Sequence, residues 1–226
     1  MRGWLALVGG NEWTDGCTFD ADLLEKSDTR TVTVLPTAAA FEQPSAAVAN
    51  ATAWFERLGA TVEVCPVLSR HDAENTNHSM QLEHARFVYI AGGSPMHLRA
   101  VLKDTPALDA LVGAWEGGCT LAASSAGAMA LGDPMLDPRG GAFTLGLAVI
   151  RGLAVLPHAH EWSLERTART LRLAGASVTV AMIDERTALL RSPQGAWRVE
   201  GAGTVRLHAN GSDTSDLEML GMLLAD

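Results

Sequence analysis

The sequence has few basic residues relative to acidic ones, and it has no long apolar run near its start. Its 17 lysines and arginines stand against 26 aspartates and glutamates, a formal net charge of −9. No basic stripe is available to neutralise phosphates, which argues against nucleic-acid binding. The first apolar run covers only 4–8 and stops before a glycine pair. That run is too short for a signal-peptide core or a membrane span, so we expect a cytoplasmic chain with no membrane partner.

Cysteine is also scarce. The three cysteines are Cys17, Cys65 and Cys119, an odd set with no C-x-x-C spacing. Such a set is typical of small buried residues in a reducing compartment and not of a disulfide framework.

Short apolar runs alternate with longer amphipathic stretches. Near-continuous apolar runs are typical of strands buried on both faces of a parallel sheet, and they lie at 4–8, 31–36, 61–67, 87–92 and 120–124. Helix patterns that end near a glycine lie at 44–59, 105–118 and 162–176. In the middle one, Thr105 is the expected N-cap and Pro106 lies in the first turn.

This alternation predicts a doubly wound α/β fold with a mainly parallel sheet flanked by helices. After residue 140 the pattern changes. Segments 178–192, 196–203 and 204–212 predict short strands joined by tight turns, a short C-terminal β meander. The 226 residues contain no low-complexity linker and no internal repeat, so we expect a single domain over 1–226.

Two adjacent serines, Ser124 and Ser125, stand at the exit of an apolar run. In open α/β sheets, ligands bind beyond the carboxyl ends of the strands. A sharp strand-to-helix turn that exposes a nucleophile needs small residues two positions before and two after it. Ser125 has Ala123 and Gly127 in those positions, whereas Ser124 would have Ala126 in the glycine's place. We therefore predict Ser125 as a nucleophile; an ordinary helix N-cap is the alternative.

A glycine pair, Gly92 and Gly93, ends the preceding apolar run. Backbone amides at that point can face the same strand ends as Ser125. Together, the amides of Gly93 and Ala126 could form an oxyanion hole, which is usually the largest stabilising term in acyl transfer. A plain Gly-Gly turn ahead of a helix is the alternative interpretation.

The motif SSAGAMALG at 124–132, with AGG at 91–93 and IDERTALL at 183–190, resembles peptidase family S51, the family of dipeptidase E and cyanophycinase. The likeness extends from VGGNE at 8–12 through the C-terminal strands. It implies a class I glutamine-amidotransferase-like fold, with Ser125 as nucleophile and Gly93 and Ala126 supplying the oxyanion-hole amides. Glutamine amidotransferases of that fold would carry cysteine at this turn, so serine argues against their chemistry.

A serine nucleophile needs a base, and histidine is the usual one near neutral pH. Two histidines stand in LPHAHEW, just before a helix that carries Arg166 and Arg169. In cyanophycinase-like members of the family a histidine precedes two arginines at a similar spacing, which selects His160. A Pro-His pair, as in dipeptidase E, would instead select His158.

The third catalytic residue must be a partly buried carboxylate that orients the histidine. In the family this acid follows the serine along the chain, where DPMLDPRGGAF offers Asp133 and Asp137. We select Asp137, with Asp133 as an alternative, although an Asp-Pro pair is also an ordinary turn starter. Glu161, beside the histidines, is a further alternative.

The two histidines and Glu161 could instead bind a metal. H-x-H-E is a weak signature, and no fourth ligand stands at a fixed spacing. We therefore expect neither a metal nor a cofactor.

Substrate contacts are expected from Gly92, Ser94, Arg166 and Arg169. The arginines could pair with a substrate carboxylate, or their stems could cover apolar surface. The family usually carries Gln or Asn just after the glycines, whereas AGGSP has Pro95 nearest that position. Proline has no side-chain amide for a substrate, so a preference for aspartyl substrates does not carry over.

Two functions follow from these residues. The first is a serine hydrolase that cleaves an amide bond in a small peptide through an acyl-enzyme. The second is a non-catalytic protein on the same fold that binds a small ligand or regulates. Ser125, the glycine pair and His160 together favour the enzyme, whose partner would be a small peptide. A homodimer is left open.

Overall fold

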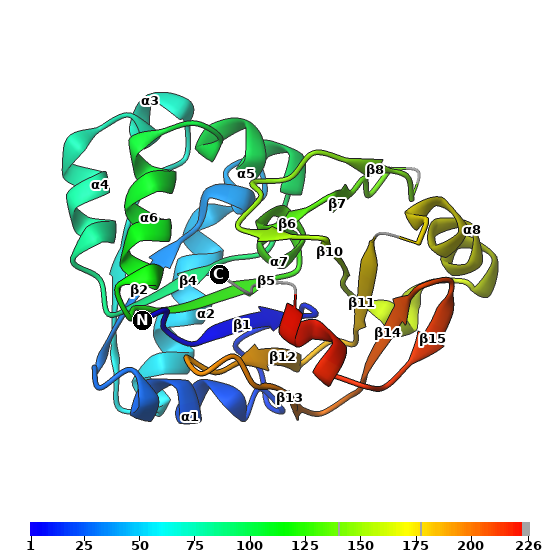
Figure 1. Cartoon of the computed structure of the whole chain (residues 1–226). Coiled ribbons are helices and arrows are strands. Elements are labelled where there is room, and N and C mark those ends of the chain that lie inside the picture. The colour runs from blue at the N-terminus through cyan, green and yellow to red at the C-terminus, as the bar shows by residue number, and fades with distance from the viewer. Residues whose placement is uncertain (140, 177, 223–226) are drawn as a thin grey trace.

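A seven-stranded sheet lies at the centre of the computed structural model, which describes residues 1–139, 141–176 and 178–222 (Figure 1). Its strand order is β13-β12-β1-β5-β4-β2-β3. Strands β1 to β5 run parallel to one another, and β12 pairs antiparallel with both β1 and β13. The bounds are β1 Leu5–Val8, β2 Thr31–Leu35, β3 Thr61–Val64, β4 Phe87–Ile90, β5 Thr120–Ser124, β12 Thr187–Arg191 and β13 Trp197–Gly201.

Each of the five predicted apolar runs forms one of the parallel strands. Every residue of β1, β4 and β5 is buried, as expected for central strands covered on both faces. The mainly parallel sheet flanked by helices confirms the predicted α/β fold class.

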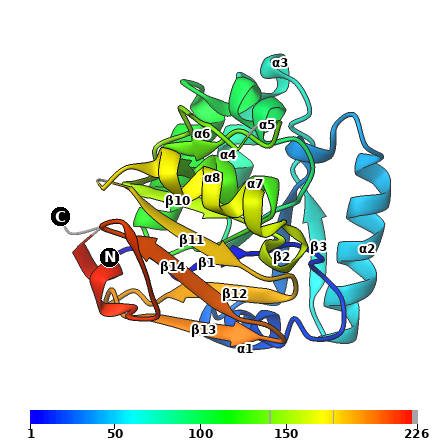
Figure 2. The same cartoon turned by 90° about the vertical axis from the view of Figure 1, so that its right-hand side faces the viewer.

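Helices cover both faces of this sheet (Figures 1 and 2). Successive side chains of a strand point to opposite faces, so Ala6 and Val8 pack with α1 and α2, whereas Leu5 and Leu7 pack with the helices of the other face. The first pair of helices is α1 Phe19–Lys26 and α2 Pro44–Arg57. The second set is α3 Arg70–Ala73, α4 Thr76–Glu83, α5 Pro95–Leu102, α6 Pro106–Glu116 and α7 Ala126–Leu131.

The helix starts follow the predicted capping chemistry. Thr105 accepts a hydrogen bond from the Leu108 amide at 3.4 Å and caps α6. Pro44 and Pro106 occupy the first turns of their helices, where a proline loses no intrahelical hydrogen bond. The third predicted helix is α8 Leu164–Ala174, which ends at Gly175.

A second, four-stranded sheet lies beside the first, in the order β10-β11-β14-β15 (Figure 2). The predicted C-terminal strands are present, and they divide between the two sheets. Strands β12 and β13 extend the large sheet, whereas β11, β14 and β15 join β10. The bounds are β10 Leu153–Leu156, β11 Thr179–Ile183, β14 Val205–Ala209 and β15 Ser212–Thr214.

Short elements complete the fold. Two short strand pairs lie between β5 and β10 in the chain. They are β6 Gly132–Asp133 with β9 Ile150–Arg151, and β7 Met135–Leu136 with β8 Phe143–Thr144. The 3₁₀ turns are η1 Thr37–Ala39, η2 Ala159–Glu161 and η3 Glu218–Met222.

The three cysteines are free and buried, as predicted. Burial raises the pKa of Cys65 and of Cys119 to about 12, so both side chains stay protonated thiols at neutral pH. None of the helices formed by the described residues is both long and apolar enough to cross a membrane.

We expect Trp115→Ala to lower the free energy of unfolding by about 3–5 kcal/mol, because truncating a buried tryptophan leaves a cavity. The Trp115 side chain is 1% exposed, and its indole N–H donates to the Gly3 carbonyl at 3.2 Å. Urea unfolding measures the loss. Phe41→Ala is the control, because Phe41 is 84% exposed and exposed substitutions usually change stability by about 0.5 kcal/mol or less. Equal midpoints for the two variants would contradict the packing of Trp115.

Candidate active site

Ser125 stands at the apex of a tight turn between β5 and α7. Its backbone φ of 47° and ψ of −108° are rare for a residue with a side chain. A methyl group added at Gly127 would lie 3.0–3.2 Å from the Ile90 side chain and backbone, a tight contact, so glycine fits this position with the least disturbance. The predicted turn of small residues around Ser125 is thus present.

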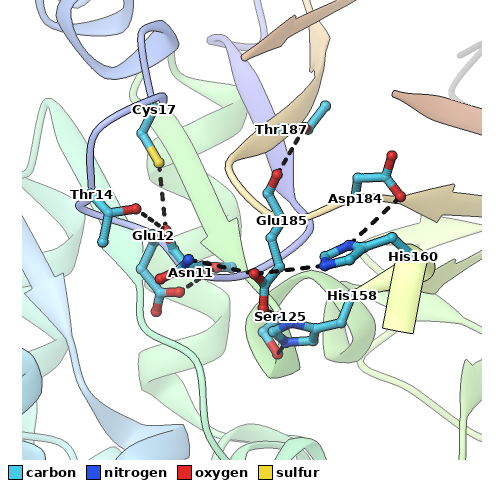
Figure 3. A network of polar contacts seen from close by, with 11 residues as sticks. Asn11, Glu12, Thr14, Cys17, Ser125, His158, His160, Asp184, Glu185 and Thr187 are labelled. Carbon is cyan, nitrogen blue, oxygen red and sulfur yellow. Dashed lines mark hydrogen bonds and ion pairs between the residues drawn. The ribbon is translucent and has the colours of Figure 1, made fainter. Parts of the chain in front are cut away.

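One continuous chain of contacts runs from Ser125 to a histidine and on to a carboxylate (Figure 3). The Ser125 Oγ lies 2.9 Å from His158 Nε2, and His158 Nδ1 lies 2.8 Å from Glu185 Oε1. A carboxylate only accepts hydrogen bonds, so the contact with Glu185 assigns the proton to Nδ1. Nε2 is then the acceptor for the Ser125 hydroxyl.

The three residues come from three separate segments that meet at the end of β1. Ser125 follows β5 in the large sheet, His158 follows β10 in the second sheet, and Glu185 lies in the link from β11 to β12. The carbonyls of residues 8–10 accept, in order, hydrogen bonds from the amides of Ser125, His158 and Arg186 at 2.8–2.9 Å. The exit of β1 therefore aligns all three segments.

Of the two predicted histidines, the structure brings His158, and not the preferred His160, to Ser125. The His160 side chain is 50% exposed, and its ring nitrogens lie 3.9 Å from carboxylate oxygens of Asp184 and Glu185, not against Ser125. The 3₁₀ turn η2 explains the difference. With about three residues per turn, side chains at i and i+2 point in different directions, whereas the two histidines would share a side in an extended strand.

The three carboxylates predicted as the acid lie elsewhere than the Nδ1 atom of His158, which Glu185 contacts. Asp137 binds the Arg139 side chain through both oxygens at 2.7 and 3.0 Å, and these hydrogen bonds lower its pKa to about 2. Asp133 accepts a hydrogen bond from the Gly146 amide at 2.9 Å. Glu161 is exposed on η2. None of the three is the carboxylate that contacts His158 Nδ1.

Glu185 was not among the predicted site residues, although it lies within the IDERTALL motif at 183–190. Asp184 and Glu185 directly follow the buried strand β11. The rule that functional side chains gather at strand ends, which selected Ser125, would have selected this acidic pair as well.

The predicted glycine pair lies against the serine turn. A methyl group added at Gly92 would lie 3.4 Å from the Ser125 Cβ. The Gly92 amide donates to Glu12 Oε1 at 2.9 Å, and the Ser124 hydroxyl donates to Glu12 Oε2 at 2.8 Å. Within the described part of the chain, the amides of Gly93 and Ala126 donate to no protein acceptor. The described residues therefore leave the hydrogen-bonding capacity of both amides unused.

Two of the other residues predicted to contact substrate, Ser94 and Arg166, interact with the protein itself. Ser94 caps α5 by accepting from the His97 amide at 3.3 Å. The Arg166 guanidinium lies 3.7 Å from the centroid of the Trp162 ring and donates to the Pro138 carbonyl at 2.7 Å. Arg169 is exposed on α8. Arg166 is thus held by the protein, in line with the alternative that these arginines cover apolar surface.

A metal-ligating arrangement also exists at this place. Ligand atoms of His158, Glu161 and Glu185 lie within 4.8 Å of one another. Two of the three already form the hydrogen bond between His158 and Glu185, so a metal ion bound there would compete with it. The sequence predicted His158, His160 and Glu161 as possible metal ligands. In the structure Glu185, and not His160, lies with the other two.

Comparison with known proteins finds relatives among peptidases. The model of peptidase family S51 matches residues 9–197. The chain is 28% identical over 187 residues to a cyanophycinase of Nostoc sp. (strain PCC 7120), covering 78% of this chain and 62% of that protein. It is 30% identical over 156 residues to a cyanophycinase of Synechococcus elongatus, covering 65% and 48%. The chain thus spans about half to three fifths of the length of these relatives.

Solved structures share the fold. A peptidase from an acI-B1 Actinobacterium superimposes with a TM-score of 0.81 at 27% identity, covering 96% of this chain and 98% of that one. A putative peptidase E protein from Listeria monocytogenes EGD-e gives a TM-score of 0.69 at 18% identity, covering 90% and 100%. These neighbours confirm the mainly parallel α/β architecture.

We expect Gly10→Ala to push the His158 ring away from Ser125. A methyl group at Gly10 would lie 2.1 Å from His158 Cε1, at a φ of +111° that side chains rarely adopt. The downfield proton NMR signal of the Nδ1–H that Glu185 accepts should disappear. Gly113→Ala is the control and should keep it, because an added methyl there meets nothing within 4 Å. A Gly10→Ala variant that retains the signal would contradict this packing.

Proposed function

Because the chain belongs to peptidase family S51, we propose that it is a serine peptidase that cleaves an amide bond in a small peptide through an acyl-enzyme. One observation carries the proposal: Ser125, His158 and Glu185 form a continuous chain of contacts at 2.9 and 2.8 Å. A serine, a base and an orienting carboxylate in this order are the parts of a hydrolytic triad, whatever the fold that carries them.

The first step forms the acyl-enzyme. Ser125 Oγ attacks the amide carbonyl while His158 Nε2 takes the hydroxyl proton, and Glu185 stabilises the imidazolium through Nδ1–H. The amides of Gly93 and Ala126 donate to the oxyanion that forms on the former carbonyl oxygen. The C–N bond then breaks, and the leaving amine takes the proton from His158 Nε2.

The second step releases the acyl group. A water molecule gives a proton to His158 Nε2 and attacks the ester carbonyl, passing through the same oxyanion site. The bond to Ser125 Oγ then breaks, and His158 returns the proton to that oxygen. The acid product leaves with the hydroxyl oxygen of the water, and the enzyme regains its starting protonation.

The cyanophycinase relatives support cyanophycin fragments as one group of candidate substrates, and dipeptides are the other. The alternative of a non-catalytic ligand-binding protein leaves the Ser125 backbone unexplained. A non-glycine residue at a φ of 47° and ψ of −108° costs stability, and a mere connecting turn would gain nothing from that cost. The enzyme is therefore the function that we propose.

We expect a fluorophosphonate probe to add one adduct to the wild-type protein and none to Ser125→Ala, as measured by intact mass. Ser124→Ala is the matched control. It should still carry the adduct at the end point, because Ser124 is buried and its hydroxyl donates to Glu12. An adduct on Ser125→Ala would assign the nucleophile to another residue, and no adduct on the wild type would count against an activated serine.

We expect His158→Ala to lower kcat/KM by about 10,000-fold, the scale seen when a triad member is removed. His160→Ala should lower it by less than about 10-fold, because His160 contacts the carboxylate pair and not Ser125. Both are measured on the peptide that the wild type cleaves fastest in a panel of dipeptides and cyanophycin. If His160→Ala were the more damaging change, the assignment of His158 as base would be wrong.

A further inference from the structure

Glu12 joins the ends of two strands that carry the proposed chemistry. Its loop follows β1, and its carboxylate accepts from the Gly92 amide after β4 and from the Ser124 hydroxyl at the end of β5, at 2.9 and 2.8 Å. The three strands are neighbours in the sheet, in the order β1-β5-β4. One side chain thus spans three neighbouring strand ends.

Both partners of Glu12 adjoin the proposed oxyanion donors. Gly92 immediately precedes Gly93, and Ser124 stands two residues before Ala126. Glu12 holds the Gly92 amide, and the Ser94 amide donates to the Ala38 carbonyl at 2.8 Å. The peptide plane that carries the Gly93 amide lies between these two anchored planes. Glu12 therefore helps to set the direction of the Gly93 amide relative to the serine turn.

The loop that carries Glu12 is costly to form. Asn11 and Trp13, on either side of Glu12, have φ values of 52° and 60°, and such a value is a genuine outlier for a bulky residue. The buried Trp13 ring packs on Tyr89 with centroids 5.1 Å apart, yet its indole N–H has no partner among the described residues. Strain of this kind persists where the position it creates is useful.

The same loop also reaches the other side of the site (Figure 3). The Asn11 carbonyl accepts from the Thr14 hydroxyl at 2.7 Å and from Cys17 Sγ at 3.7 Å. The Asn11 side-chain amide donates to Glu185 Oε2 at 3.4 Å. The loop is therefore braced internally and touches the carboxylate that orients His158.

We propose that Glu12 is a positioning residue that clamps the Gly92–Gly93 turn to the nucleophile turn and so aims the oxyanion-hole amide of Gly93. It acts through Gly92 and Ser124 and touches no reacting atom. This inference rests on the proposed serine peptidase function.

The clamp works through geometry and not through charge. A negative carboxylate near an oxyanion opposes the transition state, so the charge itself brings no benefit there. A glutamine at position 12 keeps one acceptor for the Gly92 amide, and its NH₂ can donate to the Ser124 hydroxyl, which accepts as well as donates. Glutamine should therefore preserve the clamp, whereas alanine removes it.

The experiment measures fluorophosphonate labelling of the full chain, with kinact and KI determined separately. In this reaction Ser125 Oγ bonds to phosphorus while its proton passes to His158 Nε2, fluoride leaves, and the phosphoryl oxygen occupies the oxyanion site. We expect Glu12→Ala to lower kinact by about 10- to 100-fold, the scale of a misplaced oxyanion donor, with KI within about 3-fold of wild type. Glu12→Gln should stay within about 5-fold in both constants.

Asp15→Ala is the matched control, because Asp15 is an exposed carboxylate on the same loop that pairs with Arg57 on the surface. Its kinact should equal that of wild type. Thermal unfolding is followed for every variant. If Glu12→Ala does not fold, Glu12→Asp replaces it; the shorter side chain cannot reach both donors, so its kinact should fall as for alanine.

Two results would overturn the clamp. A Glu12→Ala or Glu12→Asp variant with wild-type kinact would show that the Gly92–Gly93 turn holds itself. A Glu12→Gln variant as slow as Glu12→Ala would show that the charge is what matters. Failure of the proposed function looks different, because the wild-type protein would then remain unlabelled or Ser125→Ala would be labelled.

Discussion

The carbonyls of residues 8–10, at the exit of β1, hold the backbone of the Ser125 turn, of the His158 turn and of the Glu185–Arg186 link. Strand β1 is buried on both faces and pairs with β5 on one side and β12 on the other. Close-packed interiors do not deform easily, so this exit cannot shift without disturbing the large sheet. The rigid end of β1 thus fixes the relative positions of the three segments, so that their side chains meet over short distances.

The site lies at the junction of two sheets, which explains why its backbone is unusual. Ser125 belongs to the large sheet, whereas His158 leaves the second sheet with a φ of 51° and a ψ of 39°. Each of these conformations costs free energy that a relaxed turn would not. The apolar cores on the two faces of the large sheet supply the stability that offsets these local costs.

The fold and the serine turn could be predicted because their signals are local. Five apolar runs matched the five parallel strands, and the small residues around Ser125 marked a tight turn that needs no distant partner to be recognised. The base and the acid could not be chosen in this way. Spacing to Arg166 favoured His160, but the 3₁₀ turn η2 directs its ring toward Asp184 and Glu185 and not toward Ser125. The acid was expected close to the serine in the chain, whereas Glu185 lies far from it in sequence.

Local sequence patterns were enough to predict the order of strands and helices, the place of the serine turn and the gathering of glycines at the strand ends, because each depends on the periodicity or size of adjacent residues. The folded chain was needed to show that His158 and Glu185 complete the contact chain and that Glu12 bridges Gly92 and Ser124. Those contacts join residues separated by 27 to 112 positions. Their distances depend on how two sheets pack and on which carbonyls at the exit of β1 each segment binds, and no local pattern encodes that choice.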